Sequence, residues 1–188
     1  MIISVPKEIE PNETRVALIP SSVKQLIAAG FSVVVETKAG EKSYFFDSDY
    51  QNAGATIAPS SGQVYSDADI VAKVNPPSNE EISEIKDGCM FISFFQTMKE
   101  IDKVQSLCKK NITGFSMHLV PRTTLAQKMD ALSSQTNIAG YKAVLIAASH
   151  IEKYMPLLMT AAGTIPPAKV LVIGAGVAGQ SAIATAKR

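Results

Sequence analysis

Three glycines near the end of the chain have the spacing of a loop that can cradle a diphosphate. Gly174, Gly176 and Gly179 follow the apolar run KVLVI and open an alanine-rich segment. The first glycine permits a tight turn, the second lets the backbone approach a pyrophosphate, and the third lets helix and strand pack closely. The N-terminus of the following helix adds unpaired N–H groups and a partial positive charge. We therefore predict a strand at 169–173, a dinucleotide-binding turn and a helix at 177–187.

A glycine-rich turn without a ligand is the alternative, and agreement of the spacing with both flanks favours the binding interpretation. The acid that holds the adenosine ribose normally lies ~20 residues beyond such glycines. The chain stops nine residues after Gly179, so we expect it to be the front part of a longer protein. The predicted cofactor contacts of the turn are Gly174, Ala175, Gly176, Val177, Ala178 and Gly179.

A polar segment before a long apolar helix carries the second set of candidates. Arg122, Gln127, Asp130 and Ser133 are separated by five, three and three residues. A helix from about Leu125 would place the last three in an inclined polar row. An amide, a carboxylate and a hydroxyl suit a ligand with donors and acceptors, such as a nicotinamide carboxamide and its ribose. A solvated helix face with a cap explains the same spacing equally well.

The elements that position these residues follow from hydrophobic patterning. Short apolar runs alternate with amphipathic segments, which is typical of an α/β fold with a parallel sheet. A capping box at Ser22–Gln25 predicts a helix that ends at Gly30, and the long apolar helix is expected to start near Thr136. Further helices are predicted at 47–53 and 100–110. Strands are predicted at 2–5, 31–36, 55–57, 70–74, 90–95 and 112–115.

The predicted fold class is α/β, with two domains. Residues 1–133 form an N-terminal doubly wound parallel-sheet domain. Residues 134–188 form a linking helix and the first β-α unit of an incomplete Rossmann domain. One strand and one helix of such a domain cannot cover their own faces.

Composition excludes several classes of protein. The 188 residues are 46% hydrophobic and 19% charged with a formal net charge of +1, which excludes a disordered tail and removes the electrostatic reason to bind nucleic acid. Cys89 and Cys108 lack a CxxC spacing, so we expect neither a disulfide framework nor a metal site. A membrane helix needs roughly 20 consecutive apolar residues, and no such run is present.

Several blocks of the sequence resemble one family. The segments VPRTTLAQKMDALSSQTNIAGYKAV and TAAGTIPPAKVLVIGAGVAG are similar to the NAD(H)-binding alpha component of the proton-translocating NAD(P) transhydrogenases. EIEPNETRVALIP and VAKVNPP are similar to the same family and to its relative, alanine dehydrogenase. The resemblance covers essentially the whole chain, and DALSSQTNIAGY is its specific block.

The resemblance implies a function and a set of site residues. In the transhydrogenases a loop with this spacing lies beside the nicotinamide, which implies catalytic roles for Arg122, Gln127, Asp130 and Ser133 and a cofactor contact at Tyr141. It implies NAD(H) as the cofactor, NADP(H) on a partner domain, a membrane component that couples hydride transfer to proton movement, and a homodimer. The implied location is cytoplasmic, peripheral on the inner face of the plasma membrane through partner subunits.

Two alternatives remain. An alanine-dehydrogenase-like oxidoreductase needs acid–base chemistry, because it forms and hydrolyses an imine. The resembled alanine dehydrogenases use an Arg, a Lys and a His; this chain has Arg15 and Lys73 but Gln96 where the His is expected. Arg15 and Lys73 then line an inherited cleft or pair with nearby acids. Those acids are Glu8, Glu13 and Glu36.

The other alternative is an inactive fragment that only folds and dimerises. We expect the 188-residue chain alone to be inactive and to bind NADH too weakly to measure, because half of the cofactor site is missing from it.

Overall fold

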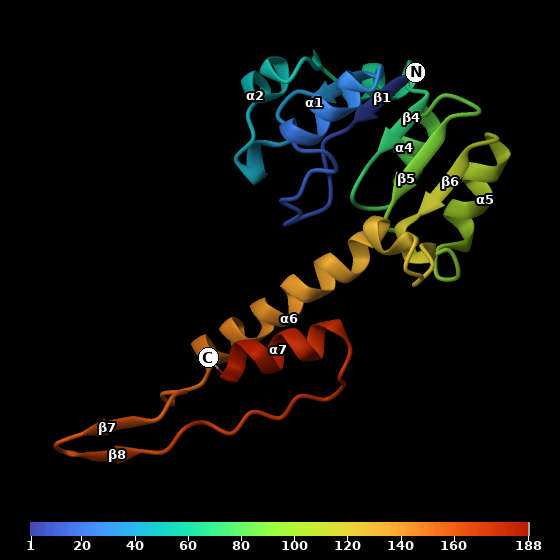
Figure 1. Cartoon of the computed structure of the whole chain (residues 1–188). Coiled ribbons are helices and arrows are strands. Elements are labelled where there is room, and N and C mark those ends of the chain that lie inside the picture. Colours follow the sequence, from blue (N-terminus) through green and yellow to red (C-terminus); the bar gives the residue numbers. More distant parts are fainter. Residues whose placement is uncertain (188) are drawn as a thin grey trace. The chain divides into compact units, whose positions relative to one another are not determined.

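The computed structural model describes residues 1–187 and divides into two compact units (Figure 1). The first unit is Met1–Val120, and the second begins at Pro121. The domain boundary that the sequence suggests, between residues 133 and 134, stays a prediction.

The first unit is built on a parallel sheet whose order is β3-β2-β1-β4-β5-β6. The chain winds outward from β1 in one direction and then returns to β4 to wind in the other. The point between β1 and β4 is therefore the topological switch point of the sheet. The strands are β1 (Ile2–Val5), β2 (Ser32–Glu36), β3 (Thr56–Ala58), β4 (Ile70–Ala72), β5 (Met90–Ser93) and β6 (Thr113–Ser116).

Helices cover both faces of this sheet, which confirms the predicted doubly wound α/β class. One core packs Ile3, Val5 and Val33 against α1 and α2. The other packs Val71 and Phe91 against the remaining helices. The helices are α1 (Pro20–Ala28), α2 (Asp47–Asn52), α3 (Ser61–Ser66), α4 (Asn79–Glu84) and α5 (Ile101–Lys109), with short 3-10 helices at Glu41–Ser43 and Met117–Leu119.

The start of α1 differs from the prediction, and its end agrees. The helix begins at Pro20 rather than at a Ser22 cap, because a proline in the first turn loses no hydrogen bond and has its φ preset. At the other end, Gly30 has φ +91°, and Phe31 N–H donates to the Leu26 carbonyl at 3.1 Å. This is a Schellman ending, which requires a residue that tolerates positive φ.

The second unit contains a pair of helices and a small hairpin. Helices α6 (Ala131–His150) and α7 (Val177–Lys187) pack side by side (Figure 1). Strands β7 (Leu158–Thr160) and β8 (Gly163–Ile165) form an antiparallel hairpin. A 3-10 helix at Ala126–Met129 precedes α6.

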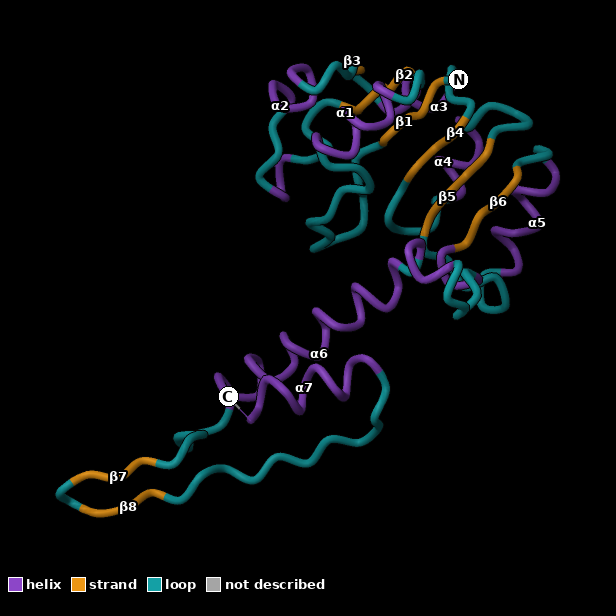
Figure 2. Tube along the Cα trace, in the orientation of Figure 1, coloured by secondary structure: helices purple, strands orange, loops and turns teal. Residues whose placement is uncertain are grey.

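The predicted strand at 169–173 is wrong for this structure. Figure 2 shows a long loop between β8 and α7, and the segment lies within it. A strand needs a neighbour to accept and donate its ladder hydrogen bonds. Among residues 1–187, β7 and β8 pair only with each other, so nothing pairs with 169–173. The predicted helix at 177–187 is confirmed.

The predicted start of the long helix near Thr136 is also wrong, as is a single helix from Leu125. The 3-10 helix ends at Met129, and Asp130 interrupts the helical backbone because its ψ is 71°. Helix α6 then starts at Ala131 because the Asp130 carboxylate accepts from the Ser133 N–H and caps the first turn. The polar row of the sequence is therefore divided between two helical pieces.

Candidate functional site

The glycine turn of the second unit has the geometry that the spacing of its three glycines predicts. Gly174 has φ +102°, which glycine adopts without strain. A Cβ on Gly179 would lie 1.9 Å from the Gly174 carbonyl oxygen, so only glycine fits there. A Cβ on Gly176 would project into open space. Its backbone is therefore accessible to a ligand.

A pocket of about 310 Å³ joins this turn to the polar segment. It brings together residues from 122–136 and residues from 173–179, and it includes two of the four predicted catalytic residues. Thr136 and Ile173 also line the pocket, although no motif in the sequence singles them out. The full lining is Arg122, Ser133, Thr136, Ile173, Gly174, Gly176, Val177, Ala178 and Gly179.

The chemistry of this lining fits an anionic, hydrogen-bonding ligand. The first N–H groups of α7 have no intrahelical acceptor, and the helix N-terminus is partially positive. The Arg122 guanidinium adds a full positive charge and several donors. Ser133 and Thr136 add hydroxyls from α6. A dinucleotide diphosphate matches this set of groups.

Asp130 does not line the pocket itself but is hydrogen-bonded to Ser133, which does. Its two carboxylate oxygens accept from the Ser133 N–H at 2.8 Å and from the Ser133 hydroxyl at 2.6 Å. These hydrogen bonds, with a smaller contribution from the Arg122 charge, lower the pKa of Asp130. Asp130 is therefore a fixed, ionised acceptor next to the lining.

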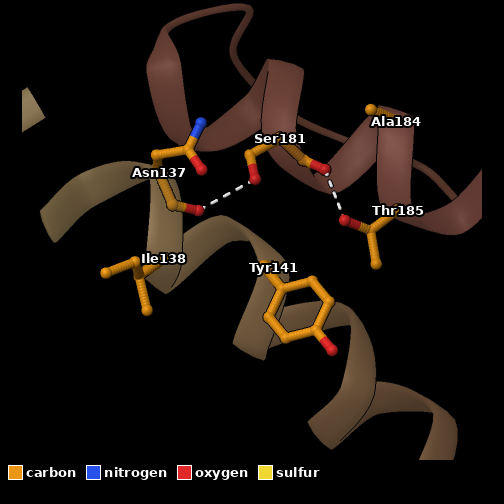
Figure 3. A pocket seen from close by; sticks show the side chains of 6 residues that line it. All are labelled: Asn137, Ile138, Tyr141, Ser181, Ala184 and Thr185. Atoms are coloured by element: carbon orange, nitrogen blue, oxygen red, sulfur yellow. Dashed lines mark hydrogen bonds between the residues drawn. The ribbon is translucent and has the colours of Figure 1, made fainter. Parts of the chain in front are cut away.

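Gln127 and Tyr141 lie elsewhere in the second unit. Gln127 is exposed on the 3-10 helix and does not line the pocket. Tyr141 lines a different pocket, of about 340 Å³, between α6 and α7 (Figure 3). In that pocket the Ser181 hydroxyl donates to the Asn137 carbonyl at 2.8 Å. The roles assigned to Gln127 and Tyr141 stay predictions.

One residue that positions the site went unnoticed in the sequence. Gly140 is buried in the middle of α6, and a Cβ there would lie 2.2 Å from the carbonyl oxygen of Ala178. The missing side chain lets the first turn of α7 approach the backbone of α6. Gly140 therefore sets the spacing of the two helices that carry the pocket.

The first unit holds a buried charged cluster at the carboxyl end of its sheet. The side chain of Lys73 is 0% exposed, and its ammonium lies 2.8 Å from Glu81 and 3.8 Å from Glu8. The Tyr65 hydroxyl donates to the second oxygen of Glu81 at 2.7 Å, and burial raises the pKa of Tyr65, so this donor keeps its proton. Arg15 forms a double hydrogen bond with Glu13, at 2.9 and 2.7 Å.

These contacts confirm that Lys73 and Arg15 pair with nearby acids. Glu8 and Glu13 are two of the three expected partners, whereas Glu36 accepts instead from the Lys7 N–H at 2.8 Å. Glu81 was missed, although the sequence carried a signal for it. Ser78 and Glu81 have capping-box spacing, and both hydrogen bonds of that box are present at the start of α4.

The Arg15–Glu13 pair predicts acid sensitivity of the first unit. The Arg15 hydrogen bonds lower the pKa of Glu13 to about 2. A depressed carboxyl pKa contributes stability that is present above about pH 4.5 and is lost as pH falls toward 2. We expect Arg15→Gln to lower the free energy of unfolding most above pH 4.5, with a deficit that shrinks as pH falls. Urea titrations of both proteins from pH 6 to 3 measure this; a deficit independent of pH would contradict it.

No helix among residues 1–187 combines the length and apolar composition that crossing a bilayer requires.

A doubly wound sheet followed by a helix pair with a diphosphate-type glycine turn defines a dinucleotide-binding class of α/β protein. Comparison with known protein families identifies the family within this class. The N-terminal domain model of Alanine dehydrogenase/PNT matches residues 4–139, and the C-terminal domain model matches residues 143–188. The chain therefore belongs to the alanine dehydrogenase/PNT family, a family of oxidoreductases that binds NAD(H).

Individual relatives support the transhydrogenase branch. The chain is 46% identical to an NAD(P) transhydrogenase alpha subunit of Rhodospirillum rubrum, an alignment covering 100% of this chain and 50% of that protein. It is 35% identical to alanine dehydrogenase of Staphylococcus saprophyticus, covering 97% and 49%. The crystal structure of a transhydrogenase from Sinorhizobium meliloti matches with a TM-score of 0.94 and 44% identity, covering 100% and 54%. The chain thus spans about half the length of these relatives.

Proposed function

We propose that this chain forms part of the NAD(H)-binding component of a proton-translocating transhydrogenase. The protein exchanges hydride between NAD(H) and NADP(H) and couples the exchange to proton movement across a membrane. The observation that carries this proposal is the pocket in which Arg122 and Ser133 face the glycine turn. The 46% identity to a transhydrogenase alpha subunit supports it.

Different residues of the second unit bind different parts of NAD(H). The glycine turn and the start of α7 hold the diphosphate, and Arg122 contributes a neutralising charge. Ser133 fixes the Asp130 carboxylate, which offers acceptors to the carboxamide or the ribose. Gln127 and Tyr141 complete the proposed contacts. When bound, the nicotinamide supplies the hydride chemistry, so this chain needs to align two rings rather than to move a proton.

The proposed function requires partner components, because this chain binds only NAD(H). A separate component holds NADP(H), and a membrane component moves the proton. The chain forms a homodimer and lies on the cytoplasmic, inner face of the plasma membrane through those partners. The R. rubrum relative is named as the alpha subunit of its transhydrogenase, which supports an assembly of several subunits.

The test of this proposal separates binding from alignment. In the full-length alpha component, mixed with its NADP-binding partner, Gln127→Ala and Asp130→Asn are expected to slow reduction of an NAD analogue by NADPH about 100-fold, because small misplacements of reacting groups are costly. The dissociation constant of NADH is expected to change only a few-fold. Asp130→Asn is used because asparagine caps a helix as well as aspartate does.

Lys128→Ala provides the matched control, because Lys128 is exposed and lies between the two test positions. It is expected to leave the rate and the NADH affinity unchanged. Equal losses of rate and affinity in the test variants would make the segment a binding element. An unchanged rate would overturn its catalytic role.

An alanine-dehydrogenase-like oxidoreductase is the alternative function, and the 35% identity to an alanine dehydrogenase supports it. It predicts oxidation of NADH that depends on pyruvate and ammonia. The pairing of Lys73 with two carboxylates argues against acid–base work by that side chain.

A further inference from the structure

The carboxyl ends of β1 and β4 flank the switch point of the first unit, where α/β sheets of this kind bind ligands. Ser4 of β1 pairs with Val71 of β4, so the segments that follow the two strands lie opposite each other. Glu8 comes from the first segment, and Lys73, Val74 and Asn75 come from the second. The crevice is therefore lined by a carboxylate on one side and by donors on the other.

The contacts of Glu8 are those of a bound carboxylate ligand. Its carboxylate accepts from the Val74 N–H at 2.6 Å, from the Asn75 N–H at 3.3 Å and from the Asn75 side-chain amide at 3.1 Å. The Lys73 ammonium lies 3.8 Å away. Successive backbone N–H groups with an adjacent cation are a recurrent anion site in proteins. Here the anion belongs to the protein itself.

No room remains in this crevice for an organic substrate. The side chains of Lys73 and Glu8 are 0% and 4% exposed. The neighbouring pocket, lined by Glu8, Glu13 and Arg15 among others, holds about 10 Å³, which is the space of one water molecule. Glu81 closes the remaining side of Lys73 at 2.8 Å.

We propose that Glu8 is a built-in carboxylate ligand of the switch point, which keeps the loop after β1 closed over Lys73. In the native chain the crevice takes no free oxo acid. A shortened side chain at position 8 converts it into a binding site for a monocarboxylate of the size of acetate.

Chemical rescue tests this proposal in the whole 188-residue chain. Glu8→Ala removes a CH₂–carboxylate unit, which acetate replaces. At constant ionic strength, with chloride exchanged for acetate, the Tm of Glu8→Ala is expected to rise with saturation by about 3–6 °C, which corresponds to a tenfold gain in the folding equilibrium for a chain of this length. The Tm of the wild type is expected not to respond.

Glu36→Ala is the matched control. Glu36 is the last residue of β2, at the carboxyl end of the sheet, and accepts one backbone N–H, from Lys7. Its side chain is only half-buried. Its variant is expected to be destabilised without rescue by acetate. A Tm of Glu8→Ala that ignores acetate, or an equal rise in Glu36→Ala and the wild type, would overturn the proposal.

Glu8→Gln keeps the test decisive if Glu8→Ala does not fold. The neutral amide preserves volume but cannot accept from all these donors, so the loop after β1 should open more often. Trypsin is then expected to cleave after Arg15 about tenfold faster than in the wild type, relative to cleavage after the exposed Lys128 in the same sample. An unchanged ratio would refute the closed loop.

Discussion

Gly140→Ala is expected to push α7 away from α6 and to destabilise the second unit by about 1–3 kcal/mol, the usual cost of overpacking. The new Cβ would lie 2.2 Å from the Ala178 carbonyl oxygen and within 3.0 Å of two more backbone atoms. Backbone atoms cannot swing away as a flexible side chain can. The hydrogen bond from Ser181 to Asn137 should be lost with the helix contact.

Helix propensity alone predicts the opposite sign. A glycine inside a helix is destabilising by roughly 0.5–1 kcal/mol relative to alanine, so a sequence-based argument expects Gly140→Ala to gain that amount. Gly62 provides the comparison, because it lies in α3 with open space where its Cβ would be. Gly62→Ala should therefore gain stability while Gly140→Ala loses it.

Thermal unfolding by circular dichroism, with hydrogen exchange of 131–150 and 177–187, measures both variants. Faster exchange confined to these two helices is expected in Gly140→Ala. If Gly140→Ala is as stable as Gly62→Ala, the close contact of the two helices is refuted.

Lys73→Met is expected to lower the free energy of unfolding of the first unit by about 3–5 kcal/mol, the cost of leaving buried charge uncompensated. The substitution leaves Glu8 and Glu81 facing each other without the ammonium between them. Lys73→Met combined with Glu81→Gln should recover part of the loss, because one of the two charges is then removed.

Urea denaturation provides the measurement, and Lys86→Met provides the control. Lys86 pairs with Asp69 at 3.3 Å, but both side chains are well exposed, at 49% and 38%. Exposed pairs contribute about 0–1 kcal/mol. The deficit of Lys73→Met should also shrink at acid pH, where a buried carboxyl without its cation takes up a proton. Equal losses in the two lysine variants would mean that Lys73 is not held as a buried pair.

Local sequence patterns were sufficient to predict the strands of the sheet and some residues of the candidate site. The run at 70–74 is continuous, apolar and followed by prolines, and it contains β4 (Ile70–Ala72). Gly30, Gly174 and Gly179 were also identified, because a positive φ or a close backbone contact restricts these positions to glycine. The short helices α3 and α4 and the β7–β8 hairpin were missed, whereas α2, β3 and β4, which are equally short, were predicted.

The remaining features depend on contacts that no local pattern encodes. Gly140 matters only because Ala178 lies against it. Glu8 meets Val74, 66 residues away, because the strand order places β1 beside β4. The segment at 169–173 has every local sign of a strand and forms none, because a strand is defined by its neighbour.

That segment gives the chain a liability toward self-association. Val170, Leu171 and Ile173 are 50%, 85% and 93% exposed, and the backbone beside them has no ladder partner among residues 1–187. Short, β-branched stretches without proline and with little charge template intermolecular sheets. When this chain is handled alone, aggregation should begin at KVLVI, and a charged residue introduced at Leu171 is the change that would suppress it.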